Sequence, residues 1–239
     1  MGNVEAAARS PTERHLFPWV PIGVAVLIFA GFAQTYYLKP WFASPILPLL
    51  LHMHGALMTA WVLLFVAQTR LIAKHRVDLH RRLGIFGAVL MVLVFAAGVV
   101  TAVRAAKLGH SPGPPPLVFL IVPLFDIVAF AILVGSALAL RRRTDWHRRL
   151  MLVATLNILP PATARLAVEY LHAPGLPFAL GVTDIAIIGA LVYDTIMHRR
   201  VHPAFAWGLG LVLFWEAAAL ALGSTPAWLG FAGWLTGFV

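Results

Sequence analysis

The chain has 239 residues, of which 61% are hydrophobic and only 11% are charged, and its mean hydropathy is +0.87. A soluble protein of this composition would expose more apolar surface than it could cover, so the composition excludes a soluble fold and indicates a membrane protein. The net charge of +9 does not indicate a nucleic-acid partner, because the basic residues separate apolar segments instead of gathering on one polar face. The chain has no cysteine, so any metal or haem ligand has to be His, Met or a carboxylate.

Seven apolar segments follow one another along the chain, each near the ~20 residues that a helix needs to cross a bilayer. We predict helices at residues 17–37, 46–68, 83–104, 117–140, 150–171, 178–197 and 204–222. The first segment follows Arg9 and Arg14 and resembles a secretory signal, but we interpret it as a retained helix. The predicted fold class is therefore all-α, a polytopic membrane helix bundle in which residues 1–239 form a single transmembrane domain surrounded by lipid bilayer.

Two further segments are not predicted to cross the membrane. The stretch from Gly109 to Pro116 is rich in Pro and Gly and is predicted to be a loop. The stretch from Trp228 to Val239 is apolar but too short to span, so residues 223–239 are predicted to form an interfacial or re-entrant tail.

The distribution of Lys and Arg predicts the orientation. Fourteen of the eighteen basic residues fall on one side of the predicted helices: Arg9, Arg14, Arg70, Lys74, Arg76, Arg81, Arg82, Arg141, Arg142, Arg143, Arg148, Arg149, Arg199 and Arg200. Only Lys39, Arg104 and Lys107 fall on the other side, and Arg165 lies within a span. By the positive-inside rule we expect a cytoplasmic N-terminus, with residues 1–15 as a cytoplasmic tail, and a periplasmic C-terminus.

One motif occurs twice in the basic loops. The first copy reads Arg76-x-Asp78-x-His80-Arg81-Arg82-Leu83, and the second copy reads Arg143-x-Asp145-x-His147-Arg148-Arg149-Leu150. Both lie between two predicted helices, which indicates an internal duplication of a helical hairpin. We expect the Asp of each copy to cap the following helix while the Arg and His side chains lie among lipid headgroups. A ligand or quinone site on the cytoplasmic face is the alternative.

Ionisable side chains inside membrane spans usually face the bundle interior and mark function, and five of them, each on a different predicted helix, fall at similar depths. From a rise of about 1.5 Å per residue, His54 and Asp126 fall roughly 12 to 14 Å deep from the outer side. Arg165, Asp184 and Glu216 fall roughly 9 Å deep by the same rule. We therefore predict that these five residues form one polar layer in the outer leaflet, with His54, Asp126, Asp184 and Glu216 as metal ligands.

Helical periodicity separates the two histidines of the second span. Residues two apart point about 200° apart on a helix, so His52 and His54 cannot share a face. His54 lies on a stripe suited to the interior, together with Met58, Trp61, Phe65 and Gln68. We expect His54 to face the polar layer, and we include Trp61 among the ligand-binding residues.

The fifth span has a similar stripe, composed of Asn157, Pro161, Arg165, Glu169 and His172. Its two prolines, Pro160 and Pro161, predict a kink that frees backbone carbonyls. We expect Asn157, Arg165 and Glu169 to contact a ligand, with Arg165 balancing charge or orienting an anionic group. An ion pair of Arg165 with Asp126 or Asp184, of structural value only, is the alternative.

Charge balance suggests what the polar layer does. Three interior carboxylates against one Arg leave an excess of negative charge, which a cation, a proton or a protonated histidine has to neutralise. We expect the layer to bind a divalent metal or a small cationic ligand, in a membrane-embedded metalloenzyme or a sensor. A proton-coupled transporter is the alternative. The chain lacks a phosphate-binding glycine loop, a G-x-S-x-G elbow and an H-E-x-x-H pair, so no catalytic residue is assigned.

Two resemblances add to this interpretation. His54, Trp61, Phe65 and Gln68, followed by the two H-R-R-L motifs at His80 and His147, resemble an uncharacterised group of bacterial multi-pass membrane proteins. That resemblance implies a location in the bacterial inner membrane. The chain is also loosely similar to helix bundles of the cytochrome b561 and ferric reductase type. This similarity implies haem b as an alternative cofactor, with His54 and His172 as the best-placed axial pair, and hence an electron carrier.

Overall fold

The computed structural model describes residues 19–42 and 46–238, which contain helices and no β-strand. The elements in chain order are α2 (Val20–Phe32), the π-helix η1 (Ala33–Tyr37), the 3₁₀ helix η2 (Lys39–Trp41), α3 (Leu49–Ala73), α4 (Val77–Lys107), α5 (Pro116–Phe119), α6 (Ile121–Ala139), α7 (Thr144–Leu156), α8 (Pro160–Tyr170), α9 (Gly175–His198), α10 (Pro203–Leu222) and α11 (Pro226–Thr236). The predicted tail at residues 1–15 lies outside the described residues.

Seven stretches of the described chain are long and apolar enough to cross a membrane, which confirms the predicted all-α bundle of seven spans. They are Val20–Tyr37, Leu49–Ala73, Val77–Lys107, Pro116–Ala139, Thr144–Tyr170, Gly175–His198 and Pro203–Leu222. The main difference from the prediction is that α4 and α7 each begin six residues earlier than expected, at Val77 and Thr144. Hydropathy marks only the lipid-immersed part of a helix, whereas Arg and Leu are good helix formers that extend it into the polar region. Both copies of the motif are therefore mostly helical.

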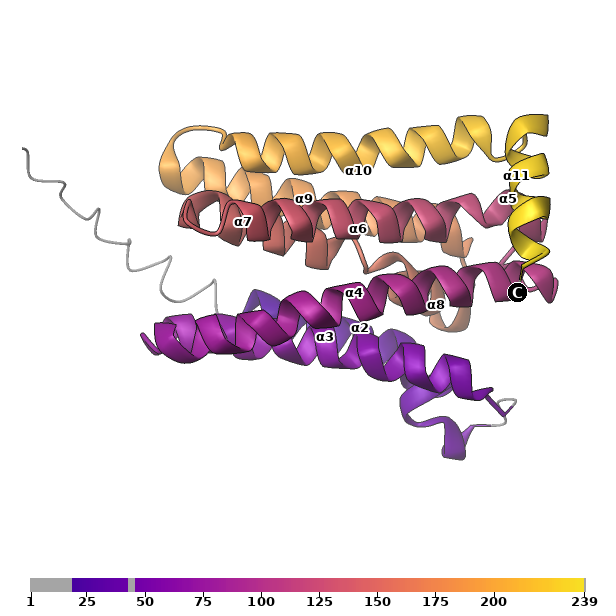
Figure 1. Ribbon diagram of the computed structural model, residues 1–239, viewed down its shortest axis with the longest axis horizontal. Helices are drawn as coiled ribbons and strands as arrows, with labels where there is room; N and C mark the ends of the chain where they lie inside the picture. Colours follow the sequence, from indigo (N-terminus) through magenta and orange to yellow (C-terminus); the bar gives the residue numbers. More distant parts are fainter. Residues whose placement is uncertain (1–18, 43–45, 239) are drawn as a thin grey trace, which may run out of the picture.

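The long helices run side by side in two groups (Figure 1). One group contains α2, α3 and α4, and the other contains α6, α7, α9 and α10; α4 and α6 pack together where the groups meet. The fifth span belongs to both groups, because α7 packs on α6 and α10 whereas α8 packs on α2 and α9. Its apolar window is 67% buried, compared with 11 to 39% in the other six spans. The fifth span is therefore the central element of the bundle.

The fifth span is broken between α7 and α8, at the prolines where a kink was predicted. Pro160 occupies the first position of α8, where the missing backbone N–H costs no helical hydrogen bond. Asn157 lies within the break, and the Nδ2 of its buried side chain donates to the backbone carbonyl of Asp126 in α6 at 2.9 Å. In the first turn of α8, the backbone of Ala162 lies so close to Gly31 of α2 that a β-carbon on Gly31 would overlap it. The break thus directs α8 away from α6 and α10 and against α2.

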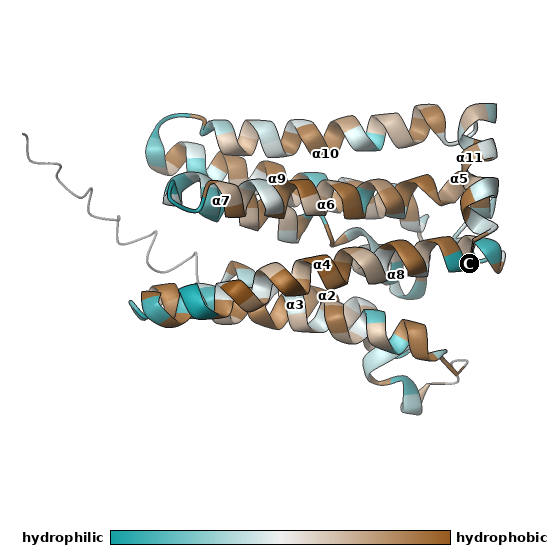
Figure 2. Ribbon diagram, in the orientation of Figure 1, coloured by the Kyte–Doolittle hydropathy of each residue, from teal (hydrophilic) through white to brown (hydrophobic). Residues whose placement is uncertain are grey.

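The two ends of the bundle differ in polarity. Figure 2 shows hydrophilic residues gathered where α3 joins α4, where α6 joins α7 and where α9 joins α10. We call this the basic end, because these connections hold Lys74, Arg76, Arg141, Arg142, Arg143, Arg199 and Arg200. At the opposite end, α11 lies across the bundle and packs on α4 and α5 (Figure 1). The indole Nε1 of Trp228 donates to the carbonyl of Leu117 at 2.8 Å, which holds this 11-residue helix in place.

Candidate functional site

Three carboxyl side chains meet in the half of the bundle away from the basic end. They belong to Asp126 of α6, Asp184 of α9 and Glu216 of α10, and we call them the acid cluster. Glu216 is the central member, because its carboxyl group adjoins that of Asp184 and also interacts electrostatically with Asp126. Oδ1 of Asp184 is buried without a hydrogen-bond partner among the described residues. The acids of three different spans therefore do converge, as the depth of their positions predicted.

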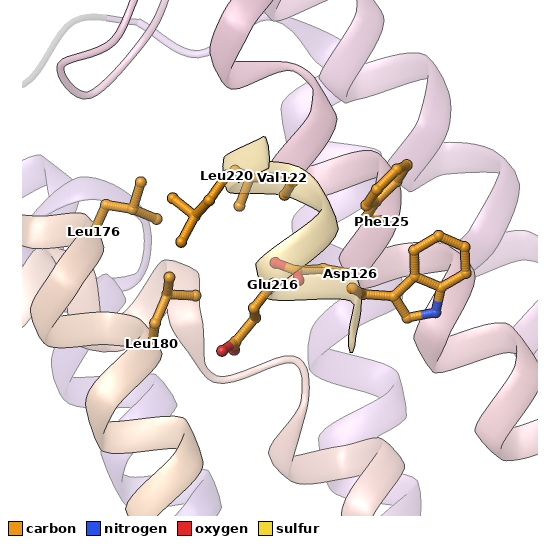
Figure 3. Close-up of a pocket in the computed structure, with 9 residues that line it drawn as sticks. Val122, Phe125, Asp126, Leu176, Leu180, Glu216 and Leu220 are labelled. Carbon is orange, nitrogen blue, oxygen red and sulfur yellow. The ribbon is translucent and has the colours of Figure 1, made fainter. Parts of the chain in front are cut away.

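The space beside the acid cluster is small and apolar. Figure 3 shows Asp126 and Glu216 between Phe125 on one side and Leu180 on the other. The remaining lining residues are Val122, Leu176, Trp215, Ala219 and Leu220. The volume is about 10 Å³, which admits about one water molecule. This pocket therefore has no room for a hydrated ion or for an organic ligand.

Arg165 does not neutralise the acid cluster. Its Nη1 donates to the backbone carbonyl of Pro161 at 2.8 Å, and its guanidinium carbon lies 4.4 Å from the centre of the Phe32 ring. Its ionisable neighbours are Glu169 and His54. None of the ion pairs formed by the described residues includes a member of the acid cluster. The alternative in which Arg165 pairs with Asp126 or Asp184 is therefore wrong for this structure.

The predicted five-residue layer thus consists of two groups, the acid cluster and a second group around Arg165. His54 belongs to the second group, and its Nδ1 is buried without a hydrogen-bond partner among the described residues. Within residues 19–42 and 46–238, no three His, Asp or Glu side chains lie where they could hold a metal ion together. His54 and the three acids therefore do not form an assembled metal centre, although each of them lies in the predicted half of the bundle.

The other predicted ligand residues have different surroundings. Trp61 is a core residue that packs edge-on against Phe130, with ring centres 4.8 Å apart. His52 is exposed and lies beside Tyr36, so it faces away from His54 as predicted. Glu169 lies near Arg165, but its Oε2 is buried without a hydrogen-bond partner in the described part of the chain. These residues surround Arg165 or fill the core, and none of them lines the pocket at the acid cluster.

His172 lies in the turn after α8. It is exposed and its φ of 52° is in the left-handed region. A histidine in an exposed turn is not fixed by packing, so the structure provides no rigid support for the predicted axial pairing of His172 with His54.

The basic end contains a buried ion pair that the sequence interpretation missed. Nε and Nη2 of Arg149 in α7 donate to the two carboxylate oxygens of Asp194 in α9, at 2.9 and 2.7 Å. Arg149 is 2% exposed and Asp194 is 1% exposed, so the expectation that Arg149 lies among headgroups is wrong. The sequence contained a clue to this pair, because Asp194 lies inside the predicted span 178–197, close to the basic loop that follows it. An acid at that position requires a cationic partner at the same depth.

Beside this ion pair is a polar cavity of about 100 Å³, which we call the basic pocket. It is lined by Asp145, Arg148, Arg149, His198, Arg200 and His202. Nδ1 of His202 accepts the backbone N–H of Ala204 at 3.1 Å, so its Nε2 carries the proton and donates to Asp145 at 3.0 Å. Nδ1 of His198 lies 2.9 Å from the carbonyl of Asp194, and its Nε2 lies 3.4 Å from Arg148. The pocket is therefore held together by hydrogen bonds between α7, α9 and the start of α10.

The fold and these two sites define an integral membrane protein of seven apolar spans with a cluster of acids in one half and a polar cavity at the opposite, basic end. Comparison of the chain with protein-family models, with curated proteins and with solved structures finds no match.

Proposed function

We propose that this protein binds and releases a proton at the acid cluster, as the proton site of a proton-coupled transporter does. The observation that carries the proposal is the position of Glu216 between Asp126 and Asp184, with no ion pair to any of the three. Three ionised carboxylates in a low-dielectric interior repel one another and lose their hydration. Each proton that the cluster binds lowers both costs.

A proton suits this site better than the divalent metal or the small cationic ligand that the residue types also favour. The cavity admits about one water molecule, so a metal would have to enter without its hydration shell. The histidine that would complete a metal site lies beside Arg165, whose positive charge opposes a second cation. A proton needs neither space nor a fourth ligand.

The acid cluster is linked by a hydrogen bond to the break in the fifth span. Asn157, within the break, donates to the backbone carbonyl of Asp126. Discontinuous helices near the middle of the membrane are typical of transporters, in which they line the substrate site. A change in the angle between α7 and α8 would pull on the α6 backbone at Asp126, which supports a coupling between protonation and helix movement.

The test is proton flux into liposomes that contain the purified protein and a trapped pH-sensitive dye, driven by a potassium diffusion potential. We expect Glu216→Gln to reduce the flux at least about tenfold, because the central carboxyl group is lost. Asp78→Asn is the matched control, since it neutralises an exposed carboxylate at the basic end, and it should leave the flux unchanged. Equal flux in Glu216→Gln and the unmodified protein contradicts the proposal.

Elemental analysis of protein purified without chelator separates the proton from the metal. A near-stoichiometric divalent ion that Asp184→Asn removes would overturn the proton proposal in favour of a metal site. A visible absorption spectrum with a Soret band would overturn it in favour of haem b.

We also propose that the protein lies in the bacterial inner membrane with its basic end on the cytoplasmic side. The basis is the positive-inside rule, by which Lys and Arg gather in cytoplasmic loops. A reporter fused to the C-terminus should then be periplasmic, and one inserted beside Lys74 should be cytoplasmic. A cytoplasmic C-terminal reporter contradicts this orientation.

A further inference from the structure

We propose that the basic pocket binds a phosphate group, carried either by the headgroup of an anionic lipid or by a free phosphate compound. The proposal does not depend on the acid cluster, because the two sites lie in opposite halves of the bundle and share no residue. It rests on the charge of the lining, on the fixed guanidinium group of Arg149 and on the place of the pocket at the basic end.

The charge of the pocket favours an anion. Its lining contains three arginines, Arg148, Arg149 and Arg200. It contains one carboxylate, that of Asp145. Asp194 adds a second carboxylate behind Arg149. Both carboxylates are already engaged, Asp194 with Arg149 and Asp145 with His202. The three guanidinium charges of the lining therefore exceed the two carboxylate charges.

The geometry favours a group with several acceptor oxygens. Three of the five N–H groups of Arg149 are used, two by Asp194 and one by the backbone carbonyl of Asp145 at 2.9 Å. These bonds lock the guanidinium plane and leave two N–H groups for a ligand in the pocket that it lines. Arg148 and Arg200 line the pocket from two different elements, α7 and the loop after α9. Guanidinium groups that converge in this way match the oxygens of a phosphate.

The size and the position of the cavity agree with this ligand. A volume of about 100 Å³ holds several water molecules or one phosphate group, in contrast to the space at the acid cluster. The residues that line the pocket lie at the basic end, where hydrophilic residues gather (Figure 2). Basic pockets between helices at this level are suited to the phosphates of anionic lipid headgroups.

The test is titration calorimetry on the delipidated protein in detergent, with two probes at constant ionic strength in sodium chloride. The probes are inorganic phosphate and a short-chain phosphatidylglycerol. We expect saturable binding that Arg148→Gln with Arg200→Gln weakens at least about tenfold, since each charge-assisted hydrogen bond contributes on that scale. Arg81→Gln is the matched control, because Arg81 is the exposed counterpart of Arg148 in the first copy of the motif, and it should bind as the unmodified protein does.

The outcomes separate the two sources of phosphate. Binding of phosphatidylglycerol at much lower concentration than inorganic phosphate indicates a lipid site, whereas similar affinities indicate a site for a free phosphate compound. Arg200→Gln alone, in an exposed loop position, serves as a second variant in case the double variant folds poorly. Absence of saturable binding to both probes, or equal binding in the variants, overturns the proposal.

Discussion

The two copies of the repeated motif have almost the same sequence and opposite surroundings. Arg82 in the first copy is exposed, whereas Arg149 at the corresponding position of the second copy is 2% exposed and paired with Asp194. The difference follows from the helices that they begin. The apolar window of the span that α4 forms is 11% buried, while that of the span that α7 begins is 67% buried. The same motif therefore lies at the surface where it begins α4 and contributes a buried side chain where it begins α7.

The copies also meet in space. The rings of His80 and His147 lie 6.3 Å apart, centre to centre, and almost perpendicular to each other. Yet Nδ1 of His147 lies 2.8 Å from the carbonyl of Ala137, while Nδ1 of His80 is buried without a hydrogen-bond partner among the described residues. The two histidines are therefore neighbours at the basic end but differ in their hydrogen bonds. The internal duplication stays a prediction from the sequence.

The aspartates differ from their predicted role in both copies. The residues at the N-cap positions are Arg76 and Arg143, and each Asp is the second residue of its helix, where it interacts favourably with the helix dipole. Asp78 adds only a 3.7 Å contact with the exposed Arg76, whereas Asp145 accepts a hydrogen bond from His202 at 3.0 Å. The expectation that each Asp caps the following helix is therefore wrong, and the substitutions below test how far the two aspartates differ.

The largest difference in stability between the copies should come from the last arginine of each motif, Arg82 in the first copy and Arg149 in the second. Asp194→Asn leaves Arg149 charged and buried without its partner, which should lower the free energy of unfolding by about 3–5 kcal/mol. Arg82→Gln in the first copy should change it by less than about 0.5 kcal/mol, because that side chain is exposed. Thermal or denaturant unfolding in detergent, followed by tryptophan fluorescence, measures both.

A double substitution sharpens this result. Arg149→Met combined with Asp194→Leu replaces the ion pair by apolar groups of similar size and should recover most of the lost stability. A loss in the double variant as large as in Asp194→Asn would show that the pair contributes through a wider polar network.

A smaller effect is expected at His202, which has no counterpart in the first copy. His202→Ala removes the cap of α10 and the hydrogen bond to Asp145, and it should lower the free energy of unfolding by about 2 kcal/mol. His110→Ala, at an exposed loop histidine, is the control and should have no measurable effect. Equal unfolding midpoints for the two variants would contradict the capping role.

The smallest difference should be between the aspartates. Asp145→Ala loses the bond to His202 and should cost about 1 kcal/mol, while Asp78→Ala loses mainly the interaction with the helix dipole and should cost about 0.5 kcal/mol. The double-mutant cycle of Asp145→Ala with His202→Ala isolates the bond between them. A coupling energy of zero, or equal costs for the two aspartates, would restore the equivalence that the sequence predicts.

Much of the fold could be predicted from the sequence, because a bilayer fixes which segments cross it and hence their position along the membrane normal. The number of spans, the loop before Pro116 and the break at Pro160 and Pro161 follow from hydropathy, length and proline chemistry alone. Depth along a helix is also readable, since each residue adds a constant rise. That is why Asp126, Asp184 and Glu216 were predicted to meet.

The order of the helices around the bundle was decided only by the tertiary structure. Depth predicted that His54 and Arg165 share a layer with the three acids, but packing of α8 against α2 separates them from the acid cluster. Arg149 and Asp194 are 45 residues apart in sequence, and they pair because α7 lies beside α9. Hydropathy marks where a span begins and ends, and the rise per residue then gives the depth of each side chain. The neighbours of that side chain depend on packing between helices, which no pattern within a single helix encodes.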